Sequence, residues 1–180
     1  NLNGMLQPFL AMEEVVAVDI ATRADCLDDE MINFLDSLCD IKPIWIELGL
    51  QTFNDEIAED FNRAYKTSVF IDTLSKLKKT RLKVCVHLIN GLPNESRESM
   101  LNNAKQLSDL KVDAIKIHML HLVSDSRLGQ AYLKEPFDLL SLEEYVDIVA
   151  SQLELIDEDI IIERLTGDAD SKTLIAPLWT

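Results

Sequence analysis

Two hydrophobic patterns alternate along the chain. Short apolar runs rich in β-branched residues, typical of strands, cover 15–22, 44–51, 83–90, 114–121 and 160–166. Segments with the 3.6-residue period of amphipathic helices cover 28–39, 54–63, 68–79, 96–109 and 141–155. Strands that alternate with helices at this spacing predict βαβ units, with a parallel sheet and right-handed crossovers.

Three of the predicted helices are preceded by residues that favour a helix start. Asn54 stands before two acidic residues, Ser96 before an Arg-Glu pair, and Ser141 three residues before Glu144, the spacing of a capping box. Such side chains accept hydrogen bonds from backbone N–H groups that have no partner inside the helix. We therefore expect a helix to begin directly after each of them.

One face of the predicted strands is apolar, whereas the other carries polar side chains. The polar face gathers Asp19, Glu47, Gln51, His87, Lys116 and His118. A doubly wound sheet would be apolar on both faces because helices cover both. One-sided polarity is typical of a curved sheet with helices outside and a ligand-holding concavity inside. The sequence therefore predicts an α/β fold, a partial (β/α) barrel of about five parallel strands, forming one domain over residues 1–180.

Length, charge and cysteine content narrow the class of protein. The 180 residues suit one globular domain, and no apolar run approaches the roughly 18 residues of a membrane-spanning helix. The formal net charge of −15 disfavours nucleic-acid binding by this chain alone, because its surface would repel a phosphate backbone. Cys26, Cys39 and Cys85 are odd in number and widely spaced, which argues against a disulfide framework and favours a reducing cytoplasm.

The polar face combines acids, an amide, a cation and two imidazoles, a set suited to a polar organic ligand. Structural ion pairing is the simpler explanation for any one of these groups. A metal site of His87, His118 and Glu47 is a further interpretation, which predicts stoichiometric zinc or manganese. His118 and His121 are expected on opposite strand faces and so cannot share a metal ion. Cys85 is on the same face as His87, but small core filling explains it better than catalysis.

Two loops that follow predicted strands are candidates for ligand contact, because β/α sites lie at the carboxyl ends of strands. In the loop 90–95, Gly91 allows the backbone to approach a ligand closely and Pro93 fixes a turn. The loop 163–168 combines a cation, a hydroxyl, a glycine and two acids. Phosphate-loop, G-x-G-x-x-G, G-x-S-x-G and H-E-x-x-H motifs are absent from the sequence, so no catalytic residue is predicted.

Five motifs in order, at 21–26 (ATRADC), 47–52 (ELGLQT), 87–93 (HLINGLP), 115–118 (IKIH) and 164–168 (RLTGD), resemble the radical S-adenosylmethionine (SAM) superfamily. The resemblance runs from about Val15 to Trp179 and is strongest to the YhcC/YtqA-like branch, which is related to Elp3-type enzymes and oxygen-independent coproporphyrinogen oxidase. It implies a partial (β/α)6 barrel that binds SAM and a [4Fe-4S] cluster and forms a 5′-deoxyadenosyl radical. It also suggests a tRNA substrate for the parent protein.

The same resemblance implies roles for individual residues. On the cofactor side it places Gln51 and Arg63 near the ribose and carboxylate of SAM, His87 at a ribose-ligand position and Gly91 beside the adenine. On the substrate side it places Glu47, Lys116, His118 and Arg164.

The C-x3-C-x2-C cluster motif of this superfamily is absent from the 180 residues. The resemblance therefore implies the C-terminal portion of the barrel, inactive alone because it lacks the cluster ligands. The sequence begins Asn-Leu-Asn-Gly-Met, without an initiator Met or a secretory signal pattern, and we expect it to start partway through a longer protein. An open barrel edge predicts a homodimer or a swapped assembly. The alternative is a non-catalytic binding or interaction module of the same fold.

Overall fold

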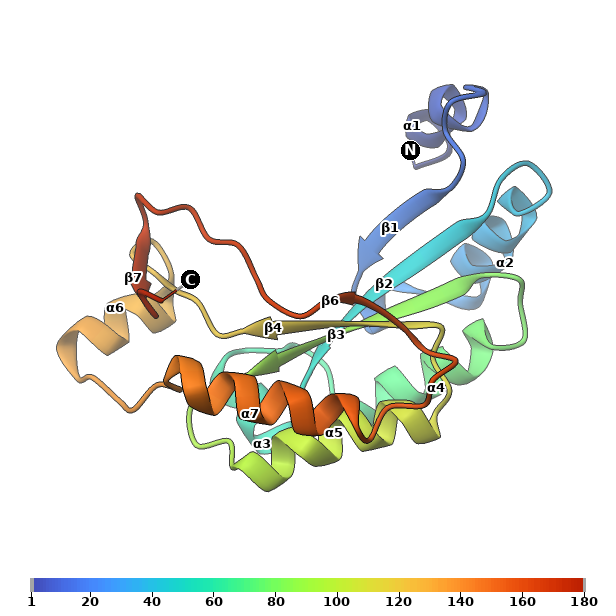
Figure 1. Ribbon diagram of the computed structural model, residues 1–180. Coiled ribbons are helices and arrows are strands. Elements are labelled where there is room, and N and C mark those ends of the chain that lie inside the picture. The colour runs from blue at the N-terminus through green and yellow to red at the C-terminus, as the bar shows by residue number, and fades with distance from the viewer. Residues whose placement is uncertain (1, 180) are drawn as a thin grey trace. The chain divides into compact units, whose positions relative to one another are not determined.

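The computed structural model describes residues 2–179, and its central feature is a sheet of five parallel strands (Figure 1). The strands follow one another in space as they do along the chain, in the order β1-β2-β3-β4-β6. They are β1 (Val18–Thr22), β2 (Ile44–Gln51), β3 (Lys83–Asn90), β4 (Ala114–Met119) and β6 (Ile161–Arg164). The predicted α/β class with five parallel strands is confirmed.

Helices occupy most of the chain between the strands. They are the 3-10 helix η1 (Ala24–Cys26) and α1 (Leu2–Leu10), α2 (Asp29–Leu38), α3 (Asp55–Asp60), α4 (Thr67–Leu77), α5 (Arg97–Asp109), α6 (Arg127–Lys134) and α7 (Leu142–Leu153). All five predicted helices are present, and α1 and α6 are additional. A second, antiparallel sheet pairs β5 (Leu122–Val123) with β7 (Leu174–Ala176), strands too short to show a period in the sequence. None of the helices in residues 2–179 is long and apolar enough to cross a membrane.

The predicted capping residues begin their helices as expected. The Asn54 side chain accepts hydrogen bonds from the backbone N–H of Glu56 and Ile57 at the start of α3. At α7 the capping box is complete, with Ser141 Oγ 3.2 Å from Glu144 N and Glu144 Oε2 2.8 Å from Ser141 N. At the start of α5, Ser96 Oγ accepts a hydrogen bond from the Ser99 N–H (3.1 Å). These three helix starts are therefore specified locally by the sequence.

The chain divides into two compact units, the first being Asn1–Leu50 with Tyr65–Val86. In it, β1 pairs with β2 in register from Val18↔Ile44 to Thr22↔Leu48. Ile44, Ile46, Leu48 and Leu50 of β2 are fully buried, whereas the residues between them are half-exposed. The alternation of faces predicted for this strand is confirmed.

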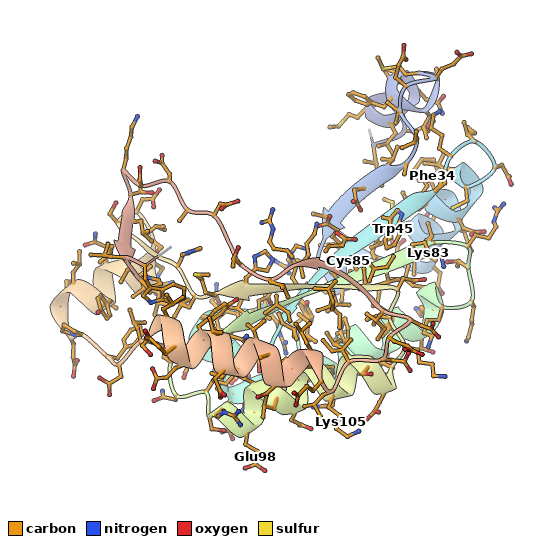
Figure 2. All side chains as sticks on the ribbon, in the orientation of Figure 1. Phe34, Trp45, Lys83, Cys85, Glu98 and Lys105 are labelled. Atoms are coloured by element: carbon orange, nitrogen blue, oxygen red, sulfur yellow. The ribbon has the colours of Figure 1, made fainter. Side chains whose placement is uncertain are left out.

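The second unit comprises Gln51–Ala64 with His87–Thr180. In it, α5 and α7 lie on the same side of β4 (Figure 1). Figure 2 shows Glu98 and Lys105 of α5 pointing away from the strands, whereas Met100 and Leu107 of the same helix are buried. The helix thus covers the apolar face of the sheet and leaves the polar face of β4 to other contacts.

Candidate functional site

Charged and imidazole side chains of the second unit meet on the polar face of β4. The β4–β6 register shifts after Ile115, so that Lys116 is the partner of Arg164 in the ladder. Lys116 Nζ lies 3.2 Å from Glu163 Oε2. The rings of His87 and His118 approach to 5.1 Å between centroids, with their planes at 31°. The structure therefore brings together four of the residues predicted for the site: His87, Lys116, His118 and Arg164.

His118 is a neutral imidazole beside Lys116 and Arg164. Burial, and then electrostatic interactions with His87, Arg164 and Lys116, lower the pKa of His118 to about 4. Its Nε2 atom is buried and has no hydrogen-bond partner within residues 2–179. A neutral imidazole at pH 7 offers one donor and one acceptor.

His121 lies near His118, and the predicted separation of these two residues on opposite faces is wrong. A Cβ atom placed on Gly167 would be 2.9 Å from His121 Cε1 and 3.6 Å from His118 Nδ1, so both rings lie beside this glycine. The alternation fails because β4 ends at Met119, two residues before His121. Burial lowers the pKa of His121, against the opposing effect of the Asp168 charge. Its Nε2 is also buried without a partner in the described part of the chain.

A small pocket opens beside Gly91, in the loop after β3. Its lining is mainly apolar and consists of Asn90, Gly91, Met119, Leu120, Leu139, Leu140, Tyr145, Pro177 and Trp179. Gly91 has φ +86°, and a Cβ atom there would lie 3.1 Å from Leu140 Cδ1. Tyr145 donates a hydrogen bond to Leu165 O (2.8 Å) and packs against Trp179 with centroids 5.5 Å apart. Both conformation and space therefore favour glycine at position 91.

The end of β3 is held by a buried amide pair that the sequence analysis missed. Asn90 Nδ2 donates to Gln152 Oε1 (2.8 Å), and Gln152 Nε2 donates to Asn90 Oδ1 and to Met100 O, both at 2.9 Å. Both side chains are almost completely buried. Gln152 lies on α7, 62 residues along the chain from Asn90, so no local signal in the sequence predicts this pairing.

Gln51 is the last residue of β2, and Arg63 lies between α3 and α4. Gln51 is half-exposed and has φ +64°. Arg63 is buried, and its guanidinium donates to Thr52 O (2.6 Å) and to Asp55 Oδ1 (2.7 Å). The structure thus shows Arg63 bound to the backbone next to Gln51, and the contact of either residue with a cofactor stays a prediction.

Glu95 is a half-buried acidic residue of this region. Its Oε1 atom accepts hydrogen bonds from Thr52 Oγ1 (2.7 Å), Asn103 Nδ2 (2.9 Å) and Ser99 Oγ (3.1 Å). Its Oε2 atom is buried and has no partner in residues 2–179. Burial raises the pKa of Glu95, although the three hydrogen bonds oppose this effect. The predicted loop 90–95 contained this residue, but nothing in the loop itself identified its partners.

His, Cys, Asp and Glu are the side chains that hold zinc ions and iron–sulfur clusters in proteins. Within residues 2–179, no three or more His, Cys, Asp or Glu side chains are placed to hold a metal ion. Cys26 is exposed, Cys39 half-buried and Cys85 buried, and all three are free thiols. Glu47 lies in the first unit, half-exposed on β2 and paired in register with Ala21. No residue of this chain is therefore assigned as a ligand of a cluster or of a zinc ion.

The structure has a parallel sheet with helices between its strands, and polar side chains and a pocket lie beside the loops that follow those strands. These features define an α/β protein of the kind that binds ligands at its strand ends. The Radical SAM superfamily family model matches residues 7–107, and the Radical_SAM C-terminal domain matches residues 112–180. The chain belongs to the radical SAM superfamily, as its motifs predicted. SAM and a [4Fe-4S] cluster are the cofactors that this family implies.

Individual relatives agree with this assignment. The chain is 40% identical over 179 residues to the uncharacterized protein YtqA of Bacillus subtilis, covering 99% of this chain and 56% of YtqA. It is 25% identical over 168 residues to a tRNA uridine(34) acetyltransferase of Methanocaldococcus jannaschii, covering 92% of this chain and 30% of that protein. The chain thus spans about half the length of YtqA and about a third of the acetyltransferase.

The fold also matches a solved structure. Elp3 of the archaeon Methanocaldococcus infernus superposes with a TM-score of 0.82 at 22% identity, over 97% of this chain and 41% of that one. At this identity the likeness is one of fold, and it confirms the predicted relationship to the Elp3 type of radical SAM fold.

Proposed function

We propose that this chain is the part of a radical SAM enzyme that binds SAM and the substrate. The observation that carries the proposal is the convergence of His87, Lys116, His118 and Arg164 on the polar face of the sheet in a chain of this family. When both cofactors are bound, the cluster and SAM together supply a 5′-deoxyadenosyl radical. The residues of this chain would bind and orient SAM and the substrate.

On the cofactor side, Gly91 is assigned to the adenine ring of SAM. The apolar pocket beside it includes two aromatic residues, Tyr145 and Trp179, that offer contacts to a flat ring. Leu140 packs against Gly91 and the pocket is small, so Leu140 would have to move to admit the ring. Gln51 and His87 are assigned to the ribose. Arg63 acts on the same region by holding Thr52 O, the carbonyl that follows Gln51.

On the substrate side, Lys116, His118 and Arg164 line the polar face, with Glu47 assigned from its place on β2. His118 is neutral at pH 7 and therefore acts as a hydrogen-bonding group rather than as a cation. The tRNA modifying activity named for the relative from M. jannaschii supports an RNA substrate for the parent protein. Because this chain carries a net charge of −15, the main phosphate contacts would come from other parts of that protein.

Cluster binding is assigned to residues outside these 180. Two observations support this: no group of three metal ligands occurs in residues 2–179, and the chain covers 56% of YtqA. The chain alone would then bind SAM weakly or not at all and would form no radical.

The test uses the full-length parent protein, purified and reconstituted with iron and sulfide in the absence of oxygen. We expect a reductant to convert SAM to 5′-deoxyadenosine and methionine, and Gln51→Ala to raise the Kd for SAM at least tenfold. Gln130→Leu, on the exposed face of α6, is the matched control and should leave the Kd unchanged. SAM binding without cleavage would favour the non-catalytic alternative, and a protein that binds no SAM would overturn the proposal.

A further inference from the structure

We propose that Glu95 is a positioning residue for the SAM site, because it ties the loop after β2 to the loop after β3. The inference rests on the proposed function, which assigns Gln51 and Gly91 to the cofactor: the first loop begins directly after Gln51, and the second carries Gly91. The Oε2 atom of Glu95 is buried, and the carboxyl group acts on Gln51 and Gly91 indirectly, through Thr52 and through the backbone of its own loop.

The first step in the argument is the number of bonds at one atom. Glu95 Oε1 accepts from three donors, which come from the loop after β2 (Thr52) and from α5 (Ser99 and Asn103). Asn103 also accepts a hydrogen bond from Phe53 N (3.0 Å), so α5 holds the β2 loop at a second point. A single carboxyl oxygen therefore joins two loops and one helix.

The second step is the backbone conformation directly before each partner. Gln51 precedes Thr52 and has φ +64°, and Asn94 precedes Glu95 and also has φ +64°. The left-handed region is uncommon for residues other than glycine and persists where surrounding contacts enforce it. At Asn94 that contact is a β-turn, which the Glu95 N–H closes to Leu92 O (3.0 Å) with Pro93 as its second residue. At Gln51 the Thr52–Glu95 hydrogen bond supplies it, and it thereby fixes the direction in which the Gln51 side chain leaves the end of β2.

The third step is the cost of placing a carboxyl group here. Glu95 Oε2 is buried without a partner, and a buried polar atom that makes no hydrogen bond is destabilising by about 1–3 kcal/mol. A position that served the core alone would be filled more favourably by an apolar side chain. The three-way acceptor is the feature that an apolar side chain could not provide.

The test compares the Kd for SAM among variants of the reconstituted full-length parent protein, under conditions in which circular dichroism shows that every variant is folded. We expect Glu95→Ala to raise the Kd for SAM about tenfold, because Gln51 is no longer held. Glu95→Gln keeps the Oε1 acceptor and should restore the Kd to within about threefold of the wild-type value. Glu98→Ala, three residues away on the exposed side of α5 (Figure 2), is the matched control and should change nothing.

Thr52→Val completes the design, because it removes the Oγ1 donor from the other side of the bond. The positioning role predicts the same rise in Kd for Thr52→Val as for Glu95→Ala, and no further rise in the double variant. If Glu95→Ala lowers stability but leaves the Kd of the folded protein unchanged, the inference is overturned. Failure of the wild-type protein to bind SAM would instead contradict the proposed function, so the two results are distinguishable.

Discussion

The buried Asn90–Gln152 pair gives a sharp prediction about what holds the end of β3. Gln152→Leu removes three hydrogen bonds and leaves Asn90 Nδ2, Asn90 Oδ1 and Met100 O without this partner in a buried site. At about 1 kcal/mol for each net hydrogen bond, the expected loss in the free energy of unfolding is about 3 kcal/mol. For a chain of this length, the corresponding fall in Tm is about 6–12 °C.

The assay is urea unfolding followed by circular dichroism, with thermal unfolding as a second measurement. Gln130→Leu is the matched control, because its amide makes one hydrogen bond at the surface, to Ser124 O, and should cost at most about 0.5 kcal/mol. Asn90→Leu combined with Gln152→Leu should be less destabilising than the sum of the single changes, since neither amide is then left alone. A loss for Gln152→Leu no larger than that of Gln130→Leu would refute the reasoning.

Four further predictions follow from local features. Ser141→Ala removes the α7 cap and should cost about 1 kcal/mol in thermal unfolding, whereas an unchanged Tm would show that the capping box is dispensable. The pKa of His118 is lowered in the folded state to about 4 from the ordinary 6.5, so the folded state binds fewer protons than the unfolded state and its stability should fall as the pH drops from 6.5 towards 4. His118→Gln should make this fall in the free energy of unfolding smaller in urea titrations. An equally steep pH profile for the variant would contradict the assignment. Gly167→Ala should destabilise the second unit and shift the His121 ring signals in NMR spectra, because its methyl group would lie 2.9 Å from that ring; unshifted signals would count against the packing. The chain of 180 residues should sediment as a dimer because β1 lies at an edge of the described sheet, and a monomer at micromolar concentration would exclude this assembly.

The sequence predicted the parts of the fold that depend on short-range patterns. The strands β2 and β3 were predicted with the bounds that the structure shows, because both are eight residues long and carry a regular apolar face. Helix starts at Asn54, Ser96 and Ser141 were predictable because the capping groups lie within four residues of the bonds they accept. The helices α1 and α6 and the strands β5 and β7 were missed, being short and without a clear period.

Only those residues of the candidate site that lie inside strands could be placed from the alternation of strand faces. His87 and His118 were correctly placed on one face, since both lie inside strands. His121 was misplaced because the strand ends two residues earlier, and its position depends instead on Gly167, which is 46 residues away. The partners of Glu95 and Gln152 likewise come from distant segments, and no periodicity carries that information.

Positive φ angles at residues other than glycine have an ordinary explanation at all but one position in residues 2–179. Four residues other than glycine have positive φ in residues 2–179: Gln51, Asn62, Asn94 and Lys111. Asn62 and Lys111 each stand just past the end of a helix, α3 and α5, where a left-handed residue is the ordinary way to stop a helix.

Asn94 is explained as well, because it is the third residue of a β-turn that the Glu95 N–H closes to Leu92 O (3.0 Å), with Pro93 at the second position. Gln51 has no such explanation, because it ends the strand β2. It directly precedes Thr52, which donates a hydrogen bond to Glu95, and the loop of Glu95 also carries Gly91. A left-handed residue that surrounding contacts hold in place is typical of functional sites. The conformation of Gln51 therefore marks the end of β2 as a part of the chain shaped for a ligand, independently of the family to which it belongs.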